Sequence, residues 1–179
     1  NAGNGLFLEE CNSKFHSAEI FGVELDEKQI CKNPSIKFVH GDIFNWTKNQ
    51  IKEKTFQQFS AVVGNPAYVN YQNLNKLTVN LDDEPSNDYK SYLLDAIKEI
   101  AEFTGELSKL EDVFRLWSKL GDFNAYMLIL SWLLTKQNGT IAFVMSNHWM
   151  ERDYGKIIKH FLSSHGTIRA IITHRKGNW

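Results

Sequence analysis

Residues 62–68 read Val62-Val63-Gly64-Asn65-Pro66-Ala67-Tyr68, and this stretch indicates the fold. Its first part continues an apolar run that begins at Ala61, and a short run of this kind is typical of a strand buried on both faces. Its second part contains the amide of Asn65, the proline Pro66 and the phenol of Tyr68. The stretch therefore predicts a buried parallel strand over residues 61–64 that presents polar groups at its carboxyl end, where open α/β sheets bind ligands.

Similar apolar runs precede this strand at residues 20–25 and 36–40, and helical or turn segments separate them. Strands that alternate with helices form βαβ units and a parallel sheet. The alternation returns after residue 121, with a helix over 123–134, a turn at Asn138-Gly139, a strand over 140–145, a helix over 154–162 and a strand over 167–173. We predict an α/β fold with a doubly wound, mostly parallel, Rossmann-like sheet.

Between these two regions the hydrophobic pattern becomes helical. From residue 88 to about 119, apolar side chains recur at spacings of three and four, which places them on one face of a helix. Gly121 follows the last of them, as glycine often follows a helix end. We predict a helical insertion over residues 74–121, packed on the sheet edge, within a single domain that spans residues 1–179.

The composition is that of an ordinary globular protein, with 42% hydrophobic and 23% charged residues in 179. No apolar run is long enough to span a membrane, and the spacing of Cys11 and Cys31 predicts no metal site but reduced thiols in a cytoplasmic protein. The net charge of −1 does not indicate nucleic-acid binding. Residues 151–179 nevertheless hold six Lys and Arg against two acids, which fits a phosphate-facing surface and a solvated helix equally well.

Two features near the N-terminus indicate a nucleoside site. Gly3-Asn4-Gly5 precedes a helical segment, and glycines in such a turn let the backbone approach a ligand closely. Glu24 ends the next apolar run, where a carboxylate can accept hydrogen bonds from both ribose hydroxyls. Dinucleotide-binding and adenosylmethionine-binding sheets share this arrangement, so it predicts a class of cofactor and no particular reaction.

Asp42 follows the run 36–40 and a turn at Gly41. An acid at this place can accept a hydrogen bond from an adenine amino group, while the backbone N–H of Ile43 meets a ring nitrogen. An aspartate after a glycine is common in turns. Asp42 therefore becomes informative only because it follows Glu24 at the next strand end.

Asn65, Pro66 and Tyr68 suit the methylation of an aromatic amine. The lone pair of adenine N6 is delocalised into the ring, so two acceptors that hold its hydrogens would localise it. The side-chain oxygen of Asn65 and the carbonyl of Pro66 can supply both, and the fixed φ of proline presents that carbonyl rigidly. Tyr68 can stack on a base that has left the duplex.

In this order the motifs resemble those of adenine-N6 DNA methyltransferases of the N-P-P-Y class, whose cofactor motifs precede the catalytic motif. The resemblance is greatest to the methyltransferase domain of single-chain type II restriction-modification enzymes, the IIG or Eco57I-like group. It implies S-adenosyl-L-methionine as the cofactor and double-stranded DNA as the substrate. Further matching segments are residues 122–126, 139–144, 146–149 and 153–155.

The resemblance also implies a role for each site residue. Gly3 and Gly5 approach the methionine part of the cofactor, and Glu24 holds the ribose. Asp42 and the Ile43 backbone bind the adenine, and the side chains of Leu25, Ile43 and Tyr126 flank that ring. The catalytic motif consists of Asn65, Pro66 and Tyr68. Ala67 stands where the family has a second proline, and the accepting carbonyl of Pro66 is unaffected. We expect the sequence to be part of a longer protein whose target recognition resides elsewhere.

Two other functions fit the same motifs. A protein glutamine-N5 methyltransferase acts on an amide and also suits Asn-Pro-x-Tyr. A non-catalytic nucleic-acid or cofactor-binding module is favoured by Ala67 and by the expectation that both ends of the sequence are incomplete. The helical insertion and Asn147-His148-Trp149 favour DNA as the substrate.

Overall fold

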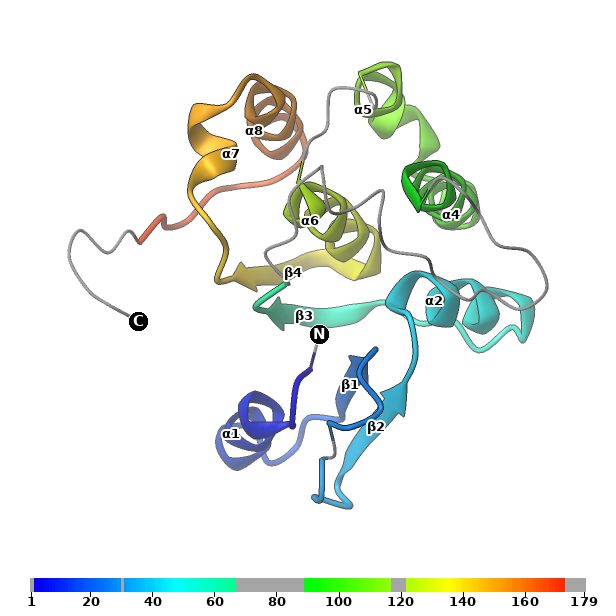
Figure 1. The fold of residues 1–179 in the computed structure, drawn as a ribbon, viewed down its shortest axis with the longest axis vertical. Coiled ribbons are helices and arrows are strands. Elements are labelled where there is room, and N and C mark those ends of the chain that lie inside the picture. Colours follow the sequence, from blue (N-terminus) through cyan, green and yellow to red (C-terminus); the bar gives the residue numbers. More distant parts are fainter. Residues whose placement is uncertain (1, 30, 67–88, 117–121, 173–179) are drawn as a thin grey trace.

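The computed structural model describes residues 2–29, 31–66, 89–116 and 122–172 (Figure 1). Helices and strands alternate in the mixed α/β pattern that the sequence predicts. In chain order the elements are α1 (Leu6–Lys14), β1 (Ile20–Glu24), β2 (Ile36–His40), α2 (Ile43–Lys52), β3 (Phe59–Gly64), α4 (Tyr89–Thr104), the 3-10 helix η1 (Leu107–Leu110), α5 (Glu111–Arg115), α6 (Phe123–Leu134), β4 (Thr135–Phe143), α7 (His148–Glu151) and α8 (Asp153–His165).

The strands form two parallel pairs. β1 pairs with β2, with Glu24 opposite His40, and β3 pairs with β4, with Gly64 opposite Phe143. The rings of Phe21 on β1 and Phe59 on β3 make an edge-to-face contact, with 5.5 Å between their centroids, which connects the two pairs. Parallel pairing is therefore confirmed. The four described strands form two separate sheets, so the single doubly wound sheet stays a prediction.

Helix α6 forms the centre of the hydrophobic core. Eleven of its twelve residues are buried, and a helix that is apolar all round is expected to be buried all round. It lies on one side of the β3–β4 pair, with α4, α5, α7 and α8 further out on the same side (Figure 1). Trp132 is its half-buried residue and contacts the ring of Phe161 on α8 at 5.0 Å. The structure confirms both predicted ends of this helix.

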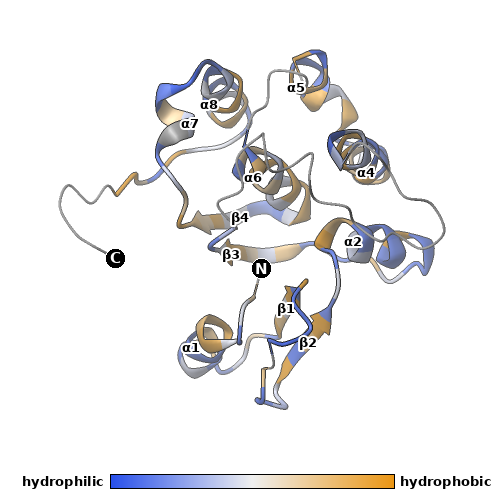
Figure 2. Cartoon of the chain, in the orientation of Figure 1, coloured by the Kyte–Doolittle hydropathy of each residue, from blue (hydrophilic) through white to orange (hydrophobic). Residues whose placement is uncertain are grey.

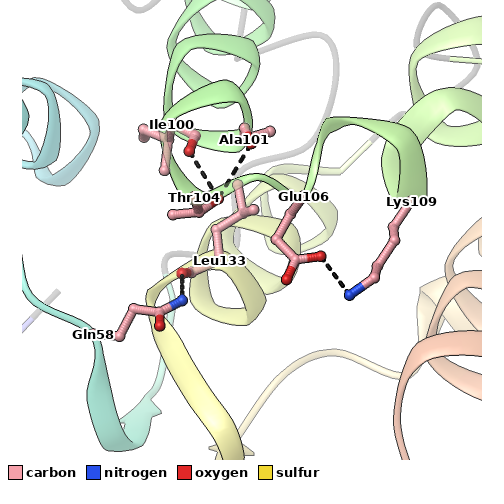
Figure 3. Close-up of polar contacts among 7 residues, drawn as sticks. All are labelled: Gln58, Ile100, Ala101, Thr104, Glu106, Lys109 and Leu133. Atoms are coloured by element: carbon pink, nitrogen blue, oxygen red, sulfur yellow. Dashed lines mark hydrogen bonds and ion pairs between the residues drawn. The ribbon is translucent and has the colours of Figure 1, made fainter.

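Side-chain hydrogen bonds hold the ends of elements around α6 (Figure 3). Gln58 donates to the carbonyl of Leu133 at 3.0 Å, which joins the start of β3 to the last turn of α6. The hydroxyl of Thr104 donates to the carbonyl of Ile100 at 2.9 Å and so closes the last turn of α4. Gly105, at φ +74°, then turns the chain into η1.

The predicted helical region is confirmed over its described part, residues 89–116. The apolar stripe of α4 is fully buried at Leu93, Ala96, Ile97 and Ile100. The expectation that it packs on the sheet edge is wrong, because α4 packs mainly on the helices α2 and α6. Its stripe is wide enough to face two helices, and it covers their apolar faces instead of a strand. The rest of the predicted insertion, 74–88 and 117–121, lies outside the described residues.

The predicted turn at Asn138-Gly139 lies inside β4. Thr135 already pairs with Phe59, and Thr140 pairs with Ala61, so five steps along β4 match two steps along β3. The extra residues form a bulge in which Asn138 adopts φ +62°. Figure 2 shows hydrophilic residues in the first part of β4 and hydrophobic ones towards its end. The predicted turn is therefore a bulge within a strand, because pairing continues on both sides of it.

The predicted strand over residues 167–173 is absent from its described part, 167–172. These residues belong to neither a helix nor a strand, and Ile172 is 95% exposed. Isoleucine and threonine favour strands only when a neighbouring strand offers a surface to pack on. Within the described chain no strand pairs with this segment.

Truncating the core of α6 should destabilise the protein strongly. Ile129 is fully buried, so Ile129→Ala leaves a cavity and is expected to lower the free energy of unfolding by about 2–5 kcal/mol in urea denaturation. The matched variant Ile172→Ala removes the same atoms from an exposed side chain and should change it by less than about 0.5 kcal/mol. Equal losses in the two variants would contradict the central position of α6.

Candidate functional site

Glu24 connects the end of β1 to the glycine turn. The side chain is only 6% exposed, and its two oxygens accept hydrogen bonds from the backbone N–H of Gly3 at 2.8 Å and of Asp26 at 3.0 Å. The backbone N–H of Ala2 also donates to the carbonyl of Val23 at 3.1 Å. The predicted glycine turn and the predicted carboxylate are therefore in direct contact. The sequence predicted that both belong to one site, but it did not predict the hydrogen bond between them.

Gly5 is required by the shape of this turn. It adopts φ +87°, and a Cβ atom built on it would lie 2.6 Å from the Sγ atom of Cys31. The glycine turn therefore packs against Cys31, in the segment that follows β1. Because Gly5 has no side chain of its own, no Cβ atom covers the backbone of the turn at this position. Leu25, the residue after the strand, is 55% exposed at the same edge.

Asp42 caps helix α2. Its Oδ1 atom accepts from the backbone N–H groups of Phe44 at 3.0 Å and Asn45 at 2.9 Å, as an N-cap carboxylate commonly does. The cap does not use the N–H of Ile43, the first residue of the helix. Helix-start amides of this kind are free to bind acceptors on ligands. The predicted contacts of Asp42 and the Ile43 amide with the cofactor adenine stay a prediction.

The loop before Asp42 is tied to the strand of Glu24. The backbone N–H of Gly41 donates to the carbonyl of Glu24 at 2.8 Å. One residue therefore contacts both predicted cofactor loops, the glycine turn through its side chain and the turn at Gly41 through its backbone. Hydrogen bonds from Gly3 and Gly41 thus join the glycine turn and the loop before Asp42 to Glu24, at the carboxyl ends of β1 and β2.

Two tyrosines of α4 that the sequence analysis did not single out lie at Asp42. The hydroxyl of Tyr92 donates to Asp42 Oδ1 at 2.7 Å, and the ring of Tyr89 stacks on that of Tyr92 with 5.7 Å between centroids. Burial, and then the negative charge of Asp42, raise the pKa of both phenols, so both stay protonated. They could not be found from the sequence, because helical spacing shows only that the two tyrosines lie on one face of α4. No sequence motif connects that face with Asp42.

Asn65 and Pro66 follow β3, at the carboxyl end of the other strand pair. Asn65 is exposed and Pro66 is buried. The backbone N–H of Val144 donates to the carbonyl of Gly64 at 3.0 Å, which holds the two strand ends together just before this motif. Tyr68, the third predicted catalytic residue, lies outside the described residues.

Tyr126 is fully buried in α6, in the core and not at a surface. Its helix begins at Asp122, whose Oδ1 atom accepts from the N–H of Asn124 at 3.0 Å. The Oδ2 atom of Asp122 accepts from the hydroxyl of Tyr154 at 3.0 Å. A contact between Tyr126 and the cofactor adenine therefore stays a prediction.

A groove of about 530 Å³ lies apart from these residues, between η1–α5 and α8. Its basic side chains each pair with a carboxylate on the same element or just before it: Lys109 with Glu106 at 2.6 Å, Arg115 with Asp112 at 2.6 Å and Lys156 with Asp153 at 2.9 Å. Such exposed pairs contribute little stability. These cations can therefore exchange their partners for other anions.

Metal and membrane features can be assessed for the described residues only. Among them, no three His, Cys, Asp or Glu side chains form a group that could hold a metal ion. None of the described helices is long and apolar enough to cross a membrane. Cys11 and Cys31 are half-buried and not joined to each other.

Comparison with known families identifies the chain as a methyltransferase. A family model described as Eco57I restriction-modification methylase matches residues 13–178, nearly the whole sequence. The chain belongs to this family of restriction-modification methylases. Comparisons with curated proteins and with solved structures gave no match. The glycine turn precedes the matched range, so its place in the site rests on its hydrogen bond to Glu24.

The close approach of Cys31 predicts an unequal response of two glycines. Gly5 and Gly105 both adopt positive φ, but only Gly5 has atoms within contact distance of an added Cβ. Gly105→Ala should lower the free energy of unfolding by about 1 kcal/mol through backbone strain alone. Gly5→Ala should cost about 2–4 kcal/mol because overpacking adds to that strain.

Urea denaturation measures both losses. Adding Cys31→Gly to Gly5→Ala removes the clashing atoms and should restore part of the stability. If Gly5→Ala and Gly105→Ala cost the same, or if Cys31→Gly gives no recovery, the packing of the turn on Cys31 is wrong.

Proposed function

We propose that this chain is the catalytic core of a site-specific DNA adenine-N6 methyltransferase of a restriction-modification system. The family supports methyl transfer within such a system. The observation that carries the finer proposal is that hydrogen bonds to Glu24 join the glycine turn and the loop before Asp42 at the strand ends, and that Asn65-Pro66 follow in the chain at the end of β3. Nucleoside recognition and amine recognition are thus assigned to successive strand ends along the chain.

The proposed cofactor is S-adenosyl-L-methionine, whose sulfonium carries the methyl group and is a strong leaving group. The donor and acceptor groups around Glu24 fit a nucleoside. An ionised carboxylate offers about four lone-pair sites, and Glu24 uses one hydrogen bond on each oxygen for the backbone, which leaves capacity for two ribose hydroxyls. Asp42 and the Ile43 amide then present an acceptor and a donor to the adenine edge, with Leu25 and Ile43 against the ring.

Catalysis is proposed to depend on positioning and electrostatics. The Asn65 oxygen and the Pro66 carbonyl accept the two hydrogens of adenine N6, which localises the nitrogen lone pair and stabilises the positive charge that develops on it. That lone pair forms the new bond to the methyl carbon while the carbon–sulfur bond breaks and its electrons remain on sulfur. The excess proton on N6 then leaves to solvent. Tyr68 stacks on the flipped base.

The proposed substrate is double-stranded DNA with one adenine turned out of the helix, which costs a few kcal/mol of unstacking. Phosphate contacts can offset this cost. The basic side chains around the α5–α8 groove, Lys109, Arg115 and Lys156, are exposed and only weakly paired, so we assign the phosphate-facing surface to this region. Target recognition is assigned to a separate region.

Removal of the Asn65 amide should abolish methyl transfer and spare cofactor binding. Asn65→Ala takes away one of the two acceptors for N6, and the loss of a preorganised catalytic hydrogen bond typically costs a factor of about 10²–10³ in kcat. Its affinity for S-adenosyl-L-methionine should stay within about threefold, because Asn65 lies on a different strand pair from Glu24. Radiolabelled methyl transfer to duplex DNA and calorimetric titration of the cofactor measure the two effects.

Asn49→Ala is the matched control, since Asn49 is an exposed asparagine on α2 and should leave transfer unchanged. Normal methylation by Asn65→Ala would show that Asn65 is not catalytic. Label in release-factor protein instead of DNA would favour the glutamine-N5 reaction. Cofactor binding without label in either substrate would leave a non-catalytic module.

A further inference from the structure

Asp42 Oδ1 accepts three hydrogen bonds from within the protein. Two come from the backbone N–H groups of Phe44 and Asn45 in the first turn of α2, and the third comes from the hydroxyl of Tyr92 at 2.7 Å. The phenol therefore binds the oxygen that the helix cap already uses. The hydroxyl of Tyr89 also hydrogen-bonds this carboxylate. A carboxylate held by this many donors has little freedom to rotate, and its Oδ2 atom has a fixed direction.

We propose that Tyr92 is a positioning residue of the cofactor site, which orients Asp42 so that Oδ2 meets the amino group of the cofactor adenine. The inference rests on the proposed function, which assigns the adenine to Asp42. It adds a specificity device to that site, because an acceptor with a fixed direction distinguishes an amino group from an oxo group at the same ring position. Tyr92 acts through Asp42 and contacts neither substrate.

The hydroxyl of Tyr92 is itself held in place. Its ring stacks on Tyr89, which is only 5% exposed and in turn stacks on Phe123 with 6.5 Å between centroids. Burial also keeps the phenol protonated, because it raises the pKa of Tyr92 far above its ordinary value. The hydroxyl therefore remains a hydrogen-bond donor above the ordinary pKa of a tyrosine.

The helix that carries Tyr92 is anchored to the helix that Asp42 caps. Two turns along α4, Glu99 pairs with Lys48 of α2 at 3.0 Å, and both side chains are partly buried. The fully buried Phe44 packs in the core at the start of α2. The ion pair and the packing of α2 on α4 thus hold Tyr92 in place relative to Asp42.

A gate is the competing interpretation of the same contact. In a gate, the Tyr92 hydroxyl would occupy the position of the adenine amino group and would have to leave before the cofactor binds. The shared use of Oδ1 argues against this, because the oxygen that Tyr92 binds is the one turned towards the helix amides. The two interpretations predict opposite effects of removing the hydroxyl on cofactor affinity.

The test uses two ligands that differ at the adenine amino group. S-adenosyl-L-homocysteine carries it, and S-inosyl-L-homocysteine has an oxo group in its place. Calorimetric titration of the wild-type protein should show a clear preference for the adenosyl ligand. Tyr92→Phe should lower the affinity for that ligand about tenfold, as expected for a lost hydrogen bond to a charged group, and should leave the affinity for the inosyl ligand within about twofold.

Two control variants separate orientation from general loosening. Tyr154→Phe removes a tyrosine hydroxyl that donates to a different helix-capping aspartate, Asp122, and Glu99→Gln weakens the α2–α4 contact away from Asp42. Both should keep the wild-type ligand preference. Their thermal unfolding, compared with that of Tyr92→Phe, shows how much stability each change removes.

Each remaining outcome decides the question. An unchanged preference in Tyr92→Phe, or an equal loss for both ligands, overturns the positioning role while the cofactor site itself stands. Tighter binding of the adenosyl ligand by Tyr92→Phe overturns it in favour of a gate. If the wild-type protein binds neither ligand, the proposed cofactor site is wrong, and the role of Tyr92 is wrong with it.

Discussion

The buried carboxylate of Glu24 is the constraint on which the site depends. A charge that is 6% exposed is costly unless it is hydrogen-bonded, and Glu24 meets this demand with backbone N–H groups from two loops. Its own carbonyl accepts from Gly41, in a third loop. The requirement to satisfy one buried acid therefore brings the glycine turn, the end of β1 and the loop before Asp42 together. A ligand that binds between these loops meets a preformed set of acceptors and amides.

Helix caps extend this assembly into the helical layer. Asp42 and Asp122 each begin a helix, and each accepts a further hydrogen bond from a tyrosine of a distant segment. The caps thus serve two purposes, because they satisfy helix amides and also define where α4 and α8 sit on α2 and α6. In this way the helical region, which the sequence places between two α/β regions, becomes part of the surroundings of Asp42.

Most elements could be predicted because their signals are local. The apolar runs of β1, β2 and β3 and the all-round apolar character of α6 depend only on the residues themselves. The failures have a common cause in pairing and packing. Residues 167–172 have the composition of a strand but no described partner, Asn138 forms a bulge because β3 continues beside it, and α4 packs on helices because their apolar faces are available.

By itself the sequence determined the order of the chemical groups: a glycine turn, Glu24, Asp42 and Asn65-Pro66, each at the end of an apolar run. This order is a property of the chain, and a family model of restriction-modification methylases matches residues 13–178. Only the tertiary structure decided which groups share hydrogen bonds, such as Gly3 with Glu24 and Tyr92 with Asp42, because those partners are 21 and 50 residues apart. Contacts over such separations depend on how α4 and the strands pack, and no local pattern encodes them.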